Sequence, residues 1–279
     1  MAHSSDTLNG NGNGNSNGNG NGDSNGNGNG NGNGNALDFD PTPSWRIFRI
    51  MSEFVSGFTF LGNIQKSVTI FGSARLPQNS PYCKKAYELG RRLAQEGYTV
   101  VTGGGPGVMQ ASNHGAWDAG GNSVGLNIEL PHEQRINPYV RRSTSFHYFF
   151  SRKVMLDFSA EAYIFFPGGF GTLDEFFELV TLVQTGKQDS ALPIILIGKS
   201  FWEPLASWMR TVMLEGLHTV AAKDLTVWTI TDDLDEVMEI VNSGVLTQEQ
   251  QRLERTGREH PTPDEKLQKA TRPMAGTEQ

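Results

Sequence analysis

Short runs of β-branched and aromatic residues alternate with helical patterns over most of this chain, and this alternation limits its fold more than any other feature. The runs are almost continuously apolar, which is typical of strands buried on both faces of a sheet. Helices separate them, so neighbouring strands should run parallel with helices on both faces. The expected strands are 68–71, 98–101, 123–128, 162–166, 193–197 and 225–228. The expected helices are about 81–96, 107–119, 149–159, one from about 172, 202–214 and 234–241. The sequence predicts one doubly wound, Rossmann-like α/β domain over residues 67–243.

Three further segments flank this domain. Residues 1–36 are mostly alternating Asn and Gly, which cannot bury enough apolar surface to offset their ordering entropy, so we expect a disordered leader. Residues 37–66 contain apolar side chains at the spacing of an amphipathic helix. Its polar face lacks a dense Lys/Arg stripe, so packing on the domain or on a partner subunit is favoured over the alternative, a membrane surface. Residues 244–279 are polar and predict a flexible tail.

Charge and composition exclude several classes of function. The net charge of -7 argues against a nucleic-acid groove, although a small acidic ligand remains compatible with it. A single cysteine provides neither a disulfide framework nor a cysteine metal cluster, and the histidines lack close ligand spacing. No stretch resembles a signal peptide or a membrane span. We therefore expect a cytoplasmic protein that needs no metal or other cofactor.

Glycine-rich loops follow three of the expected strands. Ligands of doubly wound folds bind beyond the carboxyl ends of the strands, where backbone amides and a helix N-terminus can surround a phosphate. Tight strand-to-helix turns are the alternative explanation for one such loop, but three together favour binding. Neither the G-x-G-x-x-G nor the Walker pattern is present, so a mononucleotide or sugar phosphate is favoured over NAD or ATP. The candidate binding residues are Gly72, Ser73, Gly103, Gly104, Gly105, Pro167, Gly168, Gly169, Gly171 and Thr172.

The segment 167–175, PGGFGTLDE, matches the P-G-G-x-G-T-x-x-E signature of the "Lonely guy" (LOG) family. The resemblance extends from about residue 45 to 241 and includes Gly103–Met109 and the Ser151-Arg152-Lys153 segment. The stretches near residues 45–57 and 125–131 are similar to the longer bacterial members. Nothing identifies the Schiff-base lysine of a pyridoxal-phosphate decarboxylase, despite the family's old label "lysine decarboxylase-like".

The resemblance implies a phosphoribohydrolase that cleaves the N-glycosidic bond of an adenine-type nucleoside 5'-monophosphate, either a cytokinin nucleotide or AMP. It also implies a homodimer or a larger homo-oligomer. Molybdenum-cofactor carrier proteins share the glycine signature but bind without hydrolysis, so a silent nucleotide- or cofactor-binding protein is the alternative.

N-glycosidic cleavage develops positive charge on the ribose, which a nearby carboxylate can stabilise. The resemblance assigns that carboxylate to Glu175 and an electrostatic catalytic role to Arg152, with Lys153 as a supporting charge near the nucleotide. Two structural alternatives stay open. Thr172 and Glu175 have the spacing of a helix capping box, and Arg152-Lys153 could be a solvated helix face.

Overall fold

The computed structural model describes residues 43–64, 66–129, 136–189 and 191–244. The expected disordered leader, 1–36, lies outside the described residues, and so does the expected flexible tail apart from Gly244, the last of the helical residues 234–244 that the structure describes. The remainder of the chain forms the parallel sheet with flanking helices that the alternating pattern predicts.

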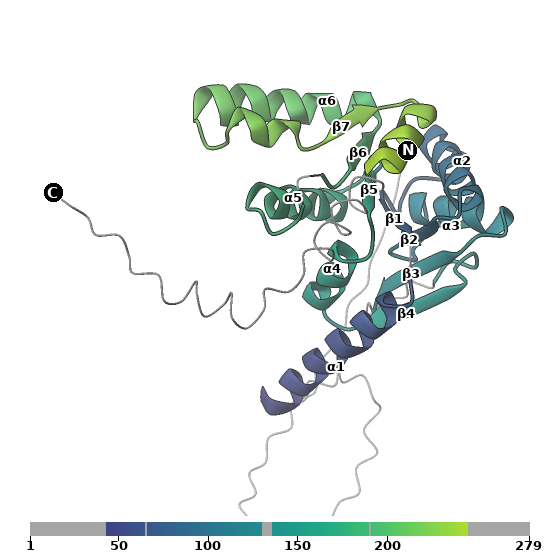
Figure 1. Cartoon of the computed structure of the whole chain (residues 1–279). Coiled ribbons are helices and arrows are strands. Elements are labelled where there is room, and N and C mark those ends of the chain that lie inside the picture. The colour runs from purple at the N-terminus through teal and green to yellow at the C-terminus, as the bar shows by residue number, and fades with distance from the viewer. Residues whose placement is uncertain (1–42, 65, 130–135, 190, 245–279) are drawn as a thin grey trace, which may run out of the picture. The chain divides into compact units, whose positions relative to one another are not determined.

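The sheet has seven strands in the order β4-β3-β2-β1-β5-β6-β7, and every neighbouring pair is parallel (Figure 1). The strands are β1 (Ser67–Phe71), β2 (Thr99–Thr102), β3 (Ser123–Ile128), β4 (Arg142–Phe146), β5 (Ala162–Phe165), β6 (Ile194–Ile197) and β7 (Thr229–Thr231). All residues of β1, β2, β3, β5 and β6 are buried, which explains why their sequences are largely apolar. The doubly wound fold class is confirmed.

Helices cover both faces of the sheet and create two hydrophobic cores (Figure 1). One core joins the sheet to α2 (Pro81–Gln95), α3 (Val108–Asp118) and the helix over 234–244. The other joins it to α1 (Pro43–Leu61), α4 (Phe149–Asp157), α5 (Phe170–Gln184) and α6 (Lys199–Trp208), which continues into the π-helix η1 (Met209–Gly216). Strands at the centre of the sheet are therefore shielded from water on both faces.

The structure corrects the expected elements at both edges of the sheet. Strand β4 was not expected because its sequence, RSTSF, is polar and mostly exposed. The expected strand 225–228 is wrong: η2, a 3-10 helix over Ala222–Thr226, precedes a later strand, β7. The Asp224 carboxylate stabilises this turn by accepting hydrogen bonds from the Ala221 amide at 2.9 Å and from Gln184 Nε2 at 2.7 Å. Edge strands such as β4 and β7 are partly exposed and contain polar residues, so an apolar run does not mark them in the sequence.

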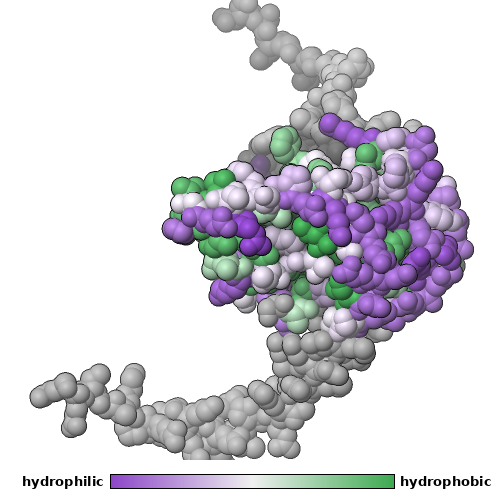
Figure 2. Space-filling view, turned by 90° about the horizontal axis from the view of Figure 1, so that it is seen from above, coloured by the Kyte–Doolittle hydropathy of each residue, from purple (hydrophilic) through white to green (hydrophobic). Residues whose placement is uncertain are grey.

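Helix α1 packs on the domain through one face only. Leu61 is buried in the second core, and a Cβ on Gly57 would come within 2.5 Å of Met155 Sδ on α4. The other face is apolar and exposed, and its side chains are Trp45, Ile47, Phe48, Met51 and Val55. Figure 2, a view from above, shows mainly hydrophilic residues on the right and a mixture of hydrophobic and hydrophilic residues on the left. Within the described ranges, no helix combines the length and apolar character needed to cross a membrane.

Candidate active site

The glycine loops meet at the point where the chain reverses its direction across the sheet. Strands β2, β3 and β4 extend from one side of β1, whereas β5, β6 and β7 extend from the other. In open α/β sheets ligands usually bind at such a point, beyond the carboxyl ends of the two central strands, which here are β1 and β5. The loops after these two strands contain Gly72-Ser73 and Pro167–Thr172, so the fold brings two of the three predicted loops to this position.

Backbone hydrogen bonds tie the three loops together. The Ser73 amide donates to the Pro167 carbonyl at 3.1 Å, and the Ser73 carbonyl accepts from the Val108 amide at 3.0 Å. Gly107, which follows the second loop, has a φ of +67°, and a Cβ there would lie 2.2 Å from the Ser73 carbonyl oxygen. The three segments therefore form one rigid rim at the end of the sheet.

Two glycines of the third loop are not explained by packing. A Cβ on Gly168 would lie 2.1 Å from Thr172 Oγ1, so this glycine is needed for close packing. A Cβ on Gly169 or on Gly171 would meet none of the described neighbours within 4 Å. Both flank the first turn of α5, where unpaired amides favour an anion. The open space favours the binding interpretation of this loop over the interpretation as a tight turn alone.

A buried polar network supports the second loop. Thr102 Oγ1 accepts a hydrogen bond from the Gly104 amide at 2.9 Å and donates to Asn113 Oδ1 at 2.7 Å. Asn137 Nδ2 donates to Asn113 Oδ1 at 2.9 Å and to the Gly105 carbonyl at 3.1 Å. The sequence analysis missed Asn113 and Asn137. The sequence does place Asn113 in a helix that must bury one face, and a buried asparagine needs hydrogen-bond partners. Its partner Asn137 could not be identified in this way because it is distant in sequence.

Arg152 lies on α4 and reaches the second loop. Its Nε donates to the Leu126 carbonyl at 2.8 Å, and a Cβ on Gly103 would lie only 2.3 Å from its Nη2. Burial lowers the pKa of Arg152, and the nearby Glu175 carboxylate opposes this shift. A guanidinium held against a glycine loop is not a solvated helix face, so that alternative does not describe Arg152.

Glu175 is buried one turn into α5. Gly169 is the N-cap of α5, so the helix begins about two residues earlier than expected. The Thr172 amide donates to the Gly169 carbonyl at 3.0 Å, and Glu175 does not close the capping box suggested by the sequence. Its side chain is 7 % exposed, and Oε2 has no hydrogen-bond partner among the described residues. Burial raises the pKa of Glu175 to about 7, although Arg152 and Lys153 oppose the shift.

Lys153 connects α4 to α5. Its Nζ lies 2.9 Å from an Asp174 carboxylate oxygen and 2.6 Å from one of Glu178. Burial alone would lower the pKa of Lys153, but hydrogen bonds to Glu178 and Asp174 outweigh it and raise the pKa well above its usual range. Both carboxylates bind the ammonium group of Lys153, so the geometry indicates that Lys153 holds α4 and α5 together. Its positive charge also lowers the pKa of Glu175. The expected contact of Lys153 with the nucleotide phosphate stays a prediction.

Two further acids adjoin Glu175, and the sequence analysis missed both. Carboxylate oxygens of Asp157, Glu175 and Glu178 all lie within 4.8 Å of one another. Burial, followed by repulsion from Glu178 and Glu175, raises the pKa of Asp157 to about 8. Such a set of oxygens could coordinate a hard cation, but Lys153 already provides positive charge to Glu178. We therefore interpret this cluster as carboxyl groups of which Asp157 and Glu175 hold their protons to a higher pH than usual.

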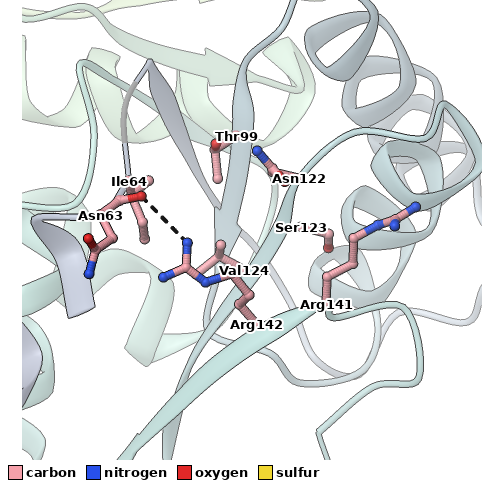
Figure 3. A pocket seen from close by; sticks show the side chains of 8 residues that line it. All are labelled: Asn63, Ile64, Thr99, Asn122, Ser123, Val124, Arg141 and Arg142. Atoms are coloured by element: carbon pink, nitrogen blue, oxygen red, sulfur yellow. Dashed lines mark hydrogen bonds between the residues drawn. The ribbon is translucent and has the colours of Figure 1, made fainter.

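A hollow lies at the opposite ends of the strands (Figure 3). It encloses about 230 Å³ and is lined by Thr99, Ser123 and Arg142, at the beginnings of β2, β3 and β4, with residues of the adjoining loops. Arg142 Nη1 donates to the Asn63 carbonyl at 3.5 Å. Because ligands of doubly wound folds bind at the carboxyl ends of strands, this hollow is not the candidate active site.

Comparison with known proteins agrees with this geometry. A family model described as "Possible lysine decarboxylase" matches residues 109–241, which include α4, α5 and the PGGFGTLDE segment. The chain is 30% identical over 161 residues to the cytokinin riboside 5'-monophosphate phosphoribohydrolase LOG of Oryza sativa subsp. japonica, covering 56% of this chain and 64% of that protein. The chain is thus similar to the LOG family over most of its α/β domain.

Other LOG relatives and solved structures support this similarity. The cytokinin riboside 5'-monophosphate phosphoribohydrolase of Rhodococcoides fascians is 29% identical over 168 residues, which are 58% of this chain and 83% of that protein. The X-ray structure of the structural-genomics target TM1055 is 27% identical with a TM-score of 0.50, covering 64% of this chain and 99% of that one. The chain spans just under two thirds of the rice relative, so its own activity and substrate are treated below as proposals.

Proposed function

We propose that this protein hydrolyses the N-glycosidic bond of an adenine-type nucleoside 5'-monophosphate, releasing the free base and ribose 5-phosphate. The observation that carries the proposal is that half-buried Arg152 lies near enough to buried Glu175 for their charges to interact, beside the three glycine loops. The relatives' names support the reaction class, and they suggest cytokinin riboside monophosphates as substrates, with AMP as the simpler candidate.

The phosphate would bind at the first turn of α5. The open space at Gly169 and Gly171 allows a ligand to approach the backbone, and the positive end of the helix dipole favours an anion there. Thr172 would contribute its hydroxyl group, since its amide already donates within the turn. This position of the phosphate directs the ribose toward Glu175, one turn further along α5.

In the proposed reaction, a water oxygen bonds to the anomeric carbon of the ribose as the bond to the base nitrogen breaks. Ionised Glu175 stabilises the positive charge on the sugar and accepts the proton that the water loses. The departing nitrogen takes a proton from solvent, so the products are neutral base and ribose 5-phosphate. Arg152 remains protonated and stabilises negative charge by hydrogen bonding, because a guanidinium is a poor proton donor.

We further propose that the protein acts as a homodimer or a larger homo-oligomer in the cytoplasm, without a nucleic-acid partner. The exposed apolar face of α1 supports self-association, since such patches mark interaction surfaces. The lone cysteine, Cys83, is free and buried, as expected in a reducing compartment. The net negative charge is unfavourable for binding a phosphate backbone.

The test is chromatographic. The purified protein is incubated separately with AMP and with isopentenyladenosine monophosphate, and free base and ribose 5-phosphate are quantified. Glu175→Gln should abolish release, whereas Glu203→Gln, at an exposed position on α6, should not change it. Binding of either nucleotide without release by the wild type would overturn the hydrolase and favour the carrier alternative.

A further inference from the structure

A carboxylate from α1 lies at the beginning of α4, the helix that presents Arg152. Glu53 accepts hydrogen bonds from the His147 amide at 2.9 Å and from the Tyr148 amide at 3.4 Å. It also accepts a short hydrogen bond from the Ser151 hydroxyl group. Tyr148 is the N-cap of α4, so these three donors all belong to the start of the helix.

Helix α4 has no capping side chain of its own. Its first turn contains no acidic residue, and the N-cap side chain of Tyr148 makes no capping hydrogen bond. The first amides of a helix need acceptors, and the positive end of the helix dipole favours a negative charge. From a distant part of the sequence, Glu53 supplies the negative charge and an acceptor for the N-cap amide of Tyr148 and for the Ser151 hydroxyl group, which matters for a helix of only nine residues.

Helix α1 also holds the middle and the end of α4. Gly57 leaves so little space that a Cβ would lie 2.5 Å from Met155 Sδ. The rings of Phe58 and Phe158 meet edge to face at 5.8 Å, just beyond the last residue of α4. Contacts at the start, middle and end of α4 leave it little freedom to shift relative to α1.

The position of Arg152 follows directly from the first turn of α4. Ser151, which is fully buried, bonds to Glu53, and the next residue is Arg152. We propose that Glu53 is a positioning residue: by fixing the first turn of α4, it directs the Arg152 guanidinium toward Gly103 and Glu175. This inference rests on the proposed function for its catalytic consequence, because Glu53 acts through Arg152.

Removal of the Glu53 side chain should not destroy the fold. The residue borders a hollow of about 340 Å³ that is also lined by Arg49, Ser52 and Ser56. Water can therefore replace the carboxylate as an acceptor for the α4 amides, but it cannot hold them in one fixed position. The expected change is a loss of alignment, which is costly in catalysis even when small.

The experiment is a double-mutant cycle on base release from the nucleotide. Glu53→Ala should lower kcat about tenfold with a smaller change in KM. Glu53→Gln should retain more activity, since its amide oxygen still accepts from the helix. In an Arg152→Ala background, Glu53→Ala should have no further effect on kcat, because the group that it positions is gone. Glu203→Ala on α6 is the control for loss of an exposed acid.

Hydrogen exchange gives a readout that does not depend on turnover. Glu53→Ala should accelerate amide exchange over 149–157 while exchange in α2 stays unchanged. The proposal is wrong if Glu53→Ala lowers kcat by the same factor in the wild-type and Arg152→Ala backgrounds. It is also wrong if Glu53→Ala leaves amide exchange in α4 unchanged. If the wild type releases no base, the proposed function fails separately, and exchange in α4 alone decides whether Glu53 holds this helix. If Glu53→Ala unfolds, the same comparisons are made with Glu53→Gln.

Discussion

The guanidinium of Arg152 lies directly against the backbone of Gly103, where an added methyl group would come within 2.3 Å of Nη2. This relationship joins two motifs that are far apart in the sequence, the second glycine loop and the Arg-Lys pair of α4. It gives Gly103 a definite function: the missing side chain leaves the space that the cation occupies.

The first prediction is that Gly103→Ala displaces Arg152 and lowers kcat about 100-fold, the order of loss that follows a misplacement of about 1 Å. The clash involves the end of a flexible side chain, so the protein should fold with little change in Tm. Steady-state kinetics and thermal denaturation of the same preparation test both statements. If Gly103→Ala has the same kcat as the wild type, catalysis does not require Arg152 in this position.

The second prediction concerns the pH dependence of kcat. Burial raises the pKa of Glu175 to about 7, and the ionised carboxylate is the active form in the proposed reaction. Activity should therefore increase through pH 7 and be about tenfold lower at pH 6 than on the plateau. Base release measured between pH 5 and 9 tests this. A rate that is independent of pH over this range would exclude Glu175 ionisation as the controlling step.

The third prediction is that Asp157→Asn stabilises the protein at pH 8. An acid whose folded pKa is raised to about 8 holds its proton when the unfolded chain has already lost it, so stability falls as pH rises from about 4 to 8. Asparagine removes this penalty while the Asp157 backbone carbonyl still accepts from Gln188 Nε2. We expect about 2 kcal/mol of added stability at pH 8, because asparagine removes a penalty of about 1.4 kcal/mol for each unit of raised pKa but still buries a polar amide at the same position.

Chemical denaturation at pH 5 and pH 8 checks this third prediction. The gain should be larger at pH 8, and Glu239→Gln, at an exposed position on the helix over 234–244, should show no such difference. An equal gain at both pH values would mean that Asp157 does not titrate with a raised pKa.

The sequence predicted the centre of this molecule better than its edges, for a physical reason. Strands such as β1 and β5 are buried on both faces and must be apolar, so their pattern is visible. Strand β4 is polar because it lies at an exposed edge, and its pairing with β3 depends on contacts that no local pattern records. The same limit applies to Asp157 and Glu178, which adjoin Glu175 only after α4 packs on α5.

The final prediction uses the link between those two helices. Lys153 lowers the pKa of Glu175, whereas Glu178 and Asp174 raise it. Lys153→Gln removes the positive charge and leaves both acids in place, so Glu175 should ionise at a higher pH. The midpoint of the kcat profile should move upward by about half a pH unit, the size expected for a nearby charge at high effective dielectric. Lys187→Gln, at an exposed position beyond the end of α5, should leave the midpoint unchanged. If Lys153 instead holds the substrate phosphate, its replacement will raise KM strongly and leave the midpoint where it is in the wild type.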